Sequence, residues 1–262
     1  MLDVHAPHEA LHTWRDFFIH IATICVGLLI AIGLEQSVEV IHHHHQREDL
    51  EHQMHVESGT NLKLVQSQLA FEQLFLQYLN ACTDALEAAS YQAGAYTVTL
   101  PVNHVQLPLD SNGMLISPSR GTWTVATASG AIALLSAETA KIYARLDLSE
   151  AFEQEAERDS GHDGNVLAIA RARDNALQEG VPLHLSSAQR DDLLSAYTGM
   201  RLDASIFAFR LAIVEGALQA ILANVHSLEE MYPYQGRAIA QAKAHGPSIP
   251  VQLPATHTPA TR

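Results

Sequence analysis

Cysteine and positive charge are both scarce in this sequence, and each shortage narrows what the protein can be. Among 262 residues there are two cysteines, Cys25 inside a long apolar run and Cys82 well beyond it, so a disulfide between them is not expected. Lysine and arginine number 15 against 29 acidic residues, which gives a net charge of −14 with histidine neutral. Such a charge repels polyanions, so nucleic acid is not expected as a partner.

Motifs that mark several large enzyme classes are absent as well. The sequence contains no G-x-S-x-G, no P-loop, no G-x-G-x-x-G and no C-x-x-C. No catalytic and no cofactor-binding residue is therefore assigned from the sequence.

What the sequence does contain is an apolar run near its N-terminus, FFIHIATICVGLLIAIGL, which starts at Phe17 and has no lysine, arginine or acid. At 1.5 Å per residue it is long enough to cross about 30 Å of hydrocarbon. Trp14 and Arg15 precede it, at the position where aromatic and cationic side chains favour the membrane interface. We predict a transmembrane helix over residues 14–41, after a tail of residues 1–13. A cleaved signal peptide would need a small-residue cleavage site that the continuation lacks, and a buried helix of a soluble domain is the other alternative.

One face of this predicted helix carries small and polar residues. On a helix of 3.6 residues per turn the spacings of three and four bring together His20, Thr23, Gly27, Ala31 and Glu35. Small residues let two helices approach closely, and polar groups avoid lipid. The face therefore predicts a homo-oligomer or a partner membrane protein bound through the transmembrane helix. The alternative is that glycine and alanine are simply common in membrane helices.

Residues 42–245 are expected to form a helical domain outside the bilayer. Residues 96–119 contain three prolines and should be a loop with short strands at most. Ser136 is a predicted N-cap, and Ser186 with Gln189 forms a capping-box pattern. The proline- and threonine-rich residues 246–262 are predicted to be disordered.

The clearest periodicity in the chain follows this capping box and steps alternately by four and three residues. The positions are Leu193, Tyr197, Met200, Ala204, Phe207, Leu211, Val214, Leu218, Ile221, Val225 and Leu228. This heptad seam favours packing within one chain over a coiled coil with a partner chain. The predicted fold is all-α: a single N-terminal transmembrane helix followed by an antiparallel helical bundle with one irregular proline-containing loop.

A histidine cluster follows the apolar run, with HHHH at residues 42–45. No cofactor is the first expectation, but helical spacing allows a divalent metal site formed by His45, Asp49, His52 and His55. A pH-responsive surface is the alternative, because imidazole titrates near pH 6.5. A solvated surface without either role is the third interpretation of the cluster.

The pattern H-E-x-x-H-x-W-R-D-F-x-x-H-x-x-T-I begins at His8 and leads into the apolar run. It resembles the N-terminal pattern of uncharacterised bacterial, acidobacterial-type single-pass membrane proteins. The resemblance implies a retained anchor and offers no activity. It also implies an interface motif, at which a partner membrane protein would dock, made of His12, Trp14, Arg15 and Asp16.

These observations favour a membrane-anchored helical scaffold, sensor-like or protein-interaction module that is not an enzyme. The alternatives are a metal- or pH-responsive module built on the juxtamembrane histidines and a membrane-bound enzyme of unknown class. The lipid bilayer is the expected partner, and the bacterial inner membrane is the expected location. Cations flank the apolar run almost equally, so the orientation, with the N-terminus in the cytoplasm and the helical domain outside, follows the common pattern of uncleaved signal anchors.

Overall fold

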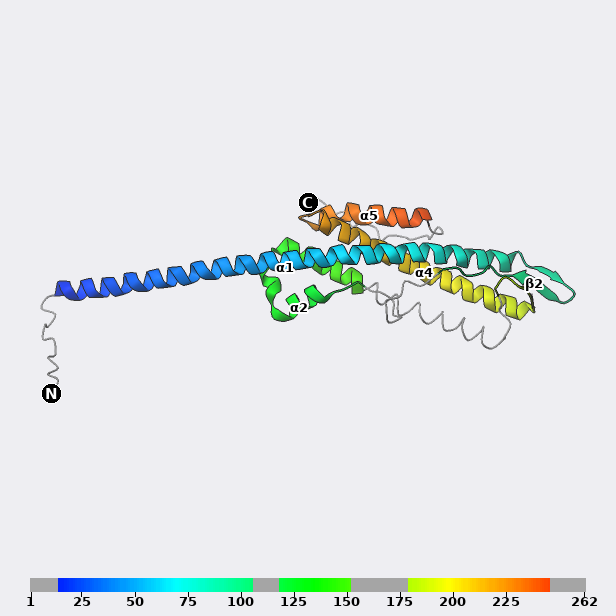
Figure 1. The fold of residues 1–262 in the computed structure, drawn as a ribbon, viewed down its shortest axis with the longest axis horizontal. Coiled ribbons are helices and arrows are strands. Elements are labelled where there is room, and N and C mark those ends of the chain that lie inside the picture. Colours follow the sequence, from blue (N-terminus) through cyan, green and yellow to red (C-terminus); the bar gives the residue numbers. More distant parts are fainter. Residues whose placement is uncertain (1–13, 106–117, 152–178, 246–262) are drawn as a thin grey trace, which may run out of the picture. The chain divides into compact units, whose positions relative to one another are not determined.

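The structure is a computed structural model that describes residues 14–105, 118–151 and 179–245. The chain divides into two compact units, Met1–Glu51 and His52–Arg262. The described elements are α1 (Trp14–Glu87), β1 (Ser90–Gln92), β2 (Ala95–Thr99), α2 (Gly121–Ser129), the short 3-10 helix η1 (Ala131–Leu134), a helix over residues 137–151, β3 (Pro182–Leu185), α4 (Ser187–Leu222) and α5 (Leu228–His245) (Figure 1). The helical fold class is confirmed. The predicted tails, residues 1–13 and 246–262, lie outside the described residues.

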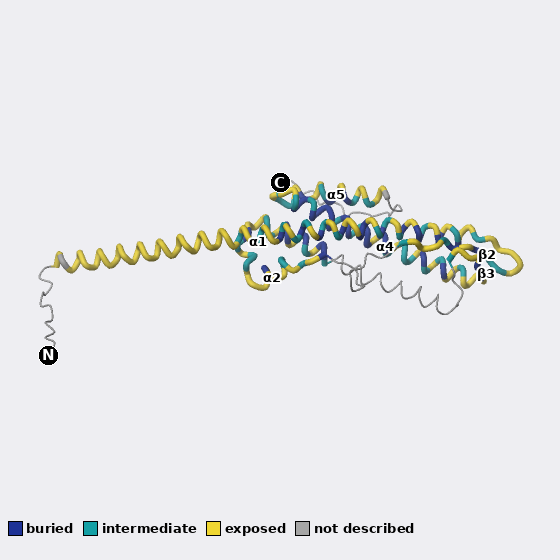
Figure 2. Tube along the Cα trace, viewed as in Figure 1, coloured by how far each residue is buried: buried dark blue, intermediate teal, exposed yellow. Residues whose placement is uncertain are grey.

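In the first unit, α1 is exposed along its whole apolar stretch. Every residue from 17 to 46 is exposed (Figure 2), and Ile24, Leu29 and Val40 are each 68% exposed. The helix continues without a break because the sequence places no proline between Trp14 and Glu87. The hydroxyls of Thr23 and Ser37 each donate a hydrogen bond to the backbone carbonyl four residues earlier. Both hydroxyls are therefore paired within the helix itself.

The second unit is built around the C-terminal half of α1 and the antiparallel α4. The amide of Gln66 donates a 3.1 Å hydrogen bond to Glu215, and Gly59 lies opposite Leu222 near the end of α4. α5 turns back along α4, so closely that a Cβ added at Gly216 would lie 2.4 Å from the Cα of Gln235. The antiparallel packing predicted for this bundle is therefore present.

The predicted heptad seam forms the core of this unit. Tyr197, Leu211, Val214 and Leu218 are all fully buried within one chain, as expected for intrachain packing. Figure 2 shows buried, dark blue stretches along α4. The seam is shorter than predicted, however, because α4 ends at Leu222 and Asn224 adopts a left-handed φ of 56°. Its last two predicted positions belong to the turn before α5 and to the start of α5.

A three-stranded antiparallel sheet, in the order β1-β2-β3, includes a short strand of the kind that the sequence allowed in the predicted loop. β2 occupies the first residues of that loop, and β3, which the sequence analysis did not predict, pairs Leu183 with Val98. Val98, Leu183 and Leu185 alternate with exposed residues and are buried, which stabilises the strands. The turn between β1 and β2 has positive φ at Ala93 and Gly94, the conformation that tight hairpins favour.

Candidate functional site

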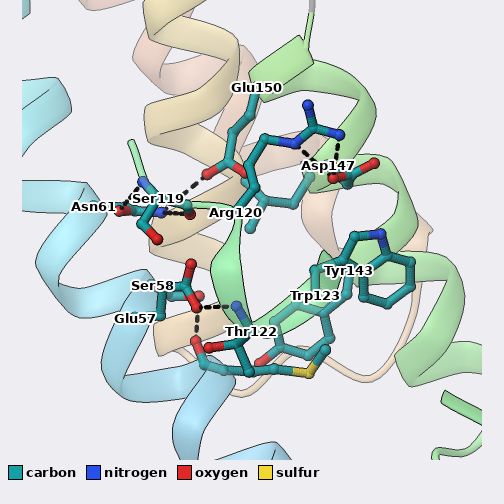
Figure 3. Close-up of a pocket in the computed structure, with 12 residues that line it drawn as sticks. Glu57, Ser58, Asn61, Ser119, Arg120, Thr122, Trp123, Tyr143, Asp147 and Glu150 are labelled. Carbon is teal, nitrogen blue, oxygen red and sulfur yellow. Dashed lines mark hydrogen bonds and ion pairs between the residues drawn. The ribbon is translucent and has the colours of Figure 1, made fainter. Parts of the chain in front are cut away.

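A small cavity in the second unit is lined mainly by polar and charged side chains. We name it the Glu150 cavity. It lies among α1, the start of α2 and the helix over residues 137–151, and the residues that line it are Met54, Glu57, Ser58, Asn61, Ser119, Arg120, Thr122, Trp123, Tyr143, Leu146, Asp147 and Glu150 (Figure 3). Its volume is about 290 Å³, including the part that is open to solvent. The space in it that a water molecule can enter is only about 20 Å³, which is room for about one water.

Asn61, which is only 2% exposed, clamps the segment before α2 to α1. Its amide nitrogen donates to the carbonyl of Ser119 at 2.7 Å, and its amide oxygen accepts from the Ser119 backbone N–H at 2.9 Å. The amide therefore pairs with the backbone much as a neighbouring strand would. The same nitrogen also donates to Oε1 of Glu150 at 3.1 Å, so Asn61 joins three segments of the chain.

One turn earlier on α1, Glu57 holds the N-terminus of α2. Its Oε2 accepts the backbone N–H of Thr122 at 2.9 Å, one of the donors that the first turn of a helix leaves unpaired. The residue at the N-cap of α2 makes no side-chain capping bond, so α1 supplies this bond. The other carboxylate oxygen of Glu57 is buried without a hydrogen-bond partner.

Glu150 is the most deeply buried acid of the cavity, with 3% of its surface exposed. Burial in a poorly solvated environment raises the pKa of Glu150 from 4.5 to about 8, because the charged form loses hydration. The negative charges of Glu57 and Asp147 act in the same direction, whereas the Asn61 hydrogen bond and the Arg120 charge oppose them. The carboxyl is therefore protonated at neutral pH.

Arg120, the single cation among the described residues that line the cavity, is already paired. Its Nε and Nη2 both lie within hydrogen-bond distance of Oδ1 of Asp147, at 2.7 and 2.6 Å. Trp123 and Tyr143 form an aromatic wall beside this pair, with ring centroids 6.4 Å apart and planes inclined by 24°. The cavity is therefore a polar junction that attaches α2 to α1, with room for water or a proton rather than for an organic substrate.

The acids that matter most in the second unit were missed by the sequence analysis. Besides Glu150, burial raises the pKa of Glu72 on α1 to about 8. Each acid carried a signal in the sequence. Glu72 occupies a position on the apolar period between Leu69 and Leu76, and Glu150 lies one turn after Leu146, so each sits where a core residue is expected.

The small and polar face predicted for the membrane helix lies on α1 in the first unit, where all five of its residues are exposed. A Cβ added at Gly27 would meet no atom within 4 Å, so the described chain leaves that face free. Association through it stays a prediction.

The predicted interface motif is described only in part. His12 lies outside the described residues, and nothing is described of the Asp16 side chain beyond its place in α1. Trp14 is 78% exposed and its ring lies 6.0 Å from that of Phe17. Docking through this motif also stays a prediction.

The predicted metal ligands all lie on α1. His45, Asp49 and His52 are exposed, and His55 is half-buried. In the described part of the chain, no group of three or more histidine, cysteine or acidic side chains is arranged to hold a metal ion. His44 instead lies 3.2 Å from Glu48, one turn further along the helix. The metal site stays a prediction.

No protein-family model, no curated protein and no solved structure matches the chain.

Proposed function

We propose that the protein is a single-pass membrane protein of the bacterial inner membrane, whose helical second unit serves as a scaffold, sensor-like or protein-interaction module. The observation that carries the proposal is the exposed apolar stretch of α1. Two described helices, α1 and α4, are long and apolar enough to cross a membrane. The most apolar part of α1 is 0% buried, whereas that of α4 is 67% buried, so α4 is a core helix.

The free energy of hydration distinguishes an α1 that spans a membrane from an α1 that lies in water. Burying one large aliphatic or aromatic side chain is worth about 1.5–3 kcal/mol. The exposed apolar residues between Phe17 and Leu34 would together cost on the order of 20 kcal/mol in water. A lipid bilayer removes that cost for every side of the helix at once, which a one-sided protein contact does not. Lipid is therefore the partner that fits this surface.

Two observations support a protein-interaction role. The Glu150 cavity is too small for an organic substrate, and the N-terminal pattern resembles that of bacterial membrane proteins. We propose a cytoplasmic N-terminus and an external second unit. We further propose that the partner, a second copy or another membrane protein, binds through the small polar face of α1 and the segment around Trp14 and Arg15. A pull-down in which Trp14→Ala and Arg15→Ala leave every partner bound would contradict binding through the segment around Trp14 and Arg15.

The anchor is tested by extraction of membranes at alkaline pH. The wild-type chain should stay in the membrane pellet, and Leu29→Arg combined with Ile24→Arg should release it. Leu202→Arg with Leu74→Arg is the matched control, because both leucines are more than half exposed in the second unit. Release of the wild-type chain, or equal release of both variants, would contradict an anchor.

Orientation needs a separate measurement. In a Cys25→Ser background, Ala128→Cys places one thiol on an exposed position of α2, while Cys82 is fully buried. A membrane-impermeant maleimide should label this thiol in spheroplasts before lysis. Labelling only after lysis would place the second unit in the cytoplasm and overturn the proposed orientation without affecting the anchor.

A further inference from the structure

We propose that the Glu150 cavity is a proton-binding site, in which the protonation of Glu150 controls how firmly α2 is attached to α1. This inference concerns the second unit alone and does not depend on the membrane anchor. It also differs from a response through the juxtamembrane histidines, because those side chains do not line the cavity.

The hydrogen bonds of Asn61 link the Glu150 carboxyl to the attachment of α2 to α1. Glu150 accepts from the same Asn61 amide nitrogen that donates to the Ser119 carbonyl. Asn61 is 2% exposed and Glu150 is 3% exposed, so the hydrogen bond between them is largely shielded from solvent. A change in the charge of Glu150 therefore acts directly on the clamp that holds the segment before α2 (Figure 3).

The charges around Glu150 make its ionised form costly. The groups that face it are Glu57 on α1, Arg120 in the segment before α2, and Asp147 on its own helix. Arg120 already forms an ion pair with Asp147 at 2.6 Å. The Oε1 atom of Glu57 is also buried, without a hydrogen-bond partner. Tyr143 is the other ionisable side chain of the described cavity lining. A negative Glu150 thus has two acids and one shared cation around it.

Burial is the largest of the effects on Glu150, larger than the stabilising hydrogen bond from Asn61, and it raises the pKa of Glu150 to about 8. The proton is therefore lost slightly above neutral pH. The resulting carboxylate recovers hydration only if water enters, and the cavity is already partly open to solvent. Water enters most simply where residues 118–123 lie against α1, which loosens the start of α2 and changes the environment of Trp123.

Trp123 supplies a direct measurement, because the sequence contains two tryptophans and the other is Trp14. We would titrate the full chain in detergent micelles, in a Trp14→Phe background, from pH 6 to 10 while recording tryptophan emission. The expected result is one transition with a midpoint near pH 8, with a red-shifted and weaker emission at high pH. Glu150→Gln, a neutral side chain of the same shape, should keep the low-pH spectrum throughout.

Glu72→Gln is the matched control, since it removes another buried carboxyl with a raised pKa that does not line the cavity. It should leave the Trp123 transition in place. An emission spectrum of the parent chain that does not change between pH 6 and 10 overturns the proposal. So does a transition that persists in Glu150→Gln with the same midpoint.

If circular dichroism shows that Glu150→Gln does not fold, Glu57→Gln decides the question. The glutamine oxygen can still accept from the Thr122 N–H, but the negative charge that raises the pKa of Glu150 is gone. The midpoint should then move to lower pH. An unchanged midpoint would show that the transition does not belong to Glu150.

Discussion

Arg190, in the first turn of α4, donates its Nε hydrogen to the carbonyl oxygen of Leu86, in the last turn of α1, at 2.9 Å. The last carbonyls of a helix have no partner within the helix, and α1 has no basic residue of its own in its last turn. The guanidinium also lies 4.9 Å from the centre of the Tyr96 ring on β2. One side chain therefore fastens α1, α4 and the small sheet together.

We expect Arg190→Ala to lower the free energy of unfolding of the second unit by about 1–3 kcal/mol, because it removes a charge-assisted hydrogen bond and a cation–π contact together. Thermal unfolding followed by circular dichroism measures the change. Arg237→Ala is the control, since the exposed Arg237 contacts the Tyr234 ring at 4.4 Å without a bond to a helix end. Equal losses in the two variants would mean that the Leu86 contact adds nothing.

The close approach of α4 and α5 predicts that alanine lowers the free energy of unfolding at Gly216 and raises it at Gly236. A Cβ at Gly216 would lie 2.4 Å from Cα and 2.6 Å from the backbone nitrogen of Gln235, so Gly216→Ala forces the helices apart. We expect a loss of about 1–3 kcal/mol in the free energy of unfolding, the usual cost of overpacking. Gly236→Ala on α5 meets no atom within 4 Å and should instead stabilise the helix by about 0.5–1 kcal/mol. An unchanged free energy of unfolding in Gly216→Ala would contradict the close contact between α4 and α5.

Buried acids make the stability of the second unit depend on pH in an unusual direction. The pKa of Glu72 is about 8 in the folded protein and 4.5 in an ordinary environment. Between these values the folded state holds a proton that the unfolded chain has lost. Raising the pH therefore lowers the stability by about 1.4 kcal/mol per pH unit for this one group, and the loss ends above pH 8.

We expect Glu72→Gln to flatten the pH dependence of the free energy of unfolding by about that slope between pH 5.5 and 7.5. Denaturant titrations of the full chain in micelles at several pH values measure it. Glu138→Gln serves as the control, because Glu138 is an exposed acid whose carboxylate is 2.7 Å from Lys141. A slope that is the same in Glu72→Gln and the parent chain would show that Glu72 is ionised in the folded state.

Local patterns predicted the helices well, because the information lies within a few residues. Ser186 and Gln189 form the capping box that their spacing indicates, and Ser136 accepts the Thr139 N–H as a helix N-cap should. The seam from Leu193 onward was predictable for the same reason, since periodicity reveals which face is apolar. Its end was not, because Asn224 leaves the helix through a left-handed turn while the apolar spacing continues.

The Glu150 cavity could not be predicted in this way. Asn61 pairs with Ser119, and Glu57 with Thr122, across long separations in the sequence. Which polar residue of α1 meets which loop depends on the tertiary packing, not on local spacing. An acid inside an apolar period, as at Glu72, marks a position that is worth suspecting, but the sequence alone does not say whether the side chain is buried or reaches solvent.

The predicted metal site on α1 has a direct test. If His45 and His52 bind zinc, the double variant His45→Ala, His52→Ala should lower the zinc affinity of the purified chain at least tenfold. His42→Ala combined with His43→Ala is the matched control, because both histidines are exposed on the same helix but lie outside the predicted ligand set. Isothermal titration calorimetry separates the two. Equal affinities for the parent chain and both variants would leave the cluster as a solvated surface.

The small face of the apolar helix makes a final prediction about self-association. Gly27 and Gly33 are both exposed on α1, and a Cβ at either position would meet no atom within 4 Å. The helical period places Gly27 on the face with Thr23 and Ala31, and Gly33 on another side. Because close packing of membrane helices depends on small residues at the contact, Gly27→Leu should weaken a dimer while Gly33→Leu should not.

Disulfide crosslinking in membranes measures this difference. In a Cys25→Ser background, Ala31→Cys should form a covalent dimer and Leu29→Cys, on the opposite side of the helix, should not. Adding Gly27→Leu to the Ala31→Cys chain should reduce the crosslink, whereas adding Gly33→Leu should leave it unchanged. Equal crosslinking at positions 29 and 31 would reflect random collision in the bilayer. The apolar stretch would then be an anchor without a specific helix partner, because lipid alone would account for the exposure of every side.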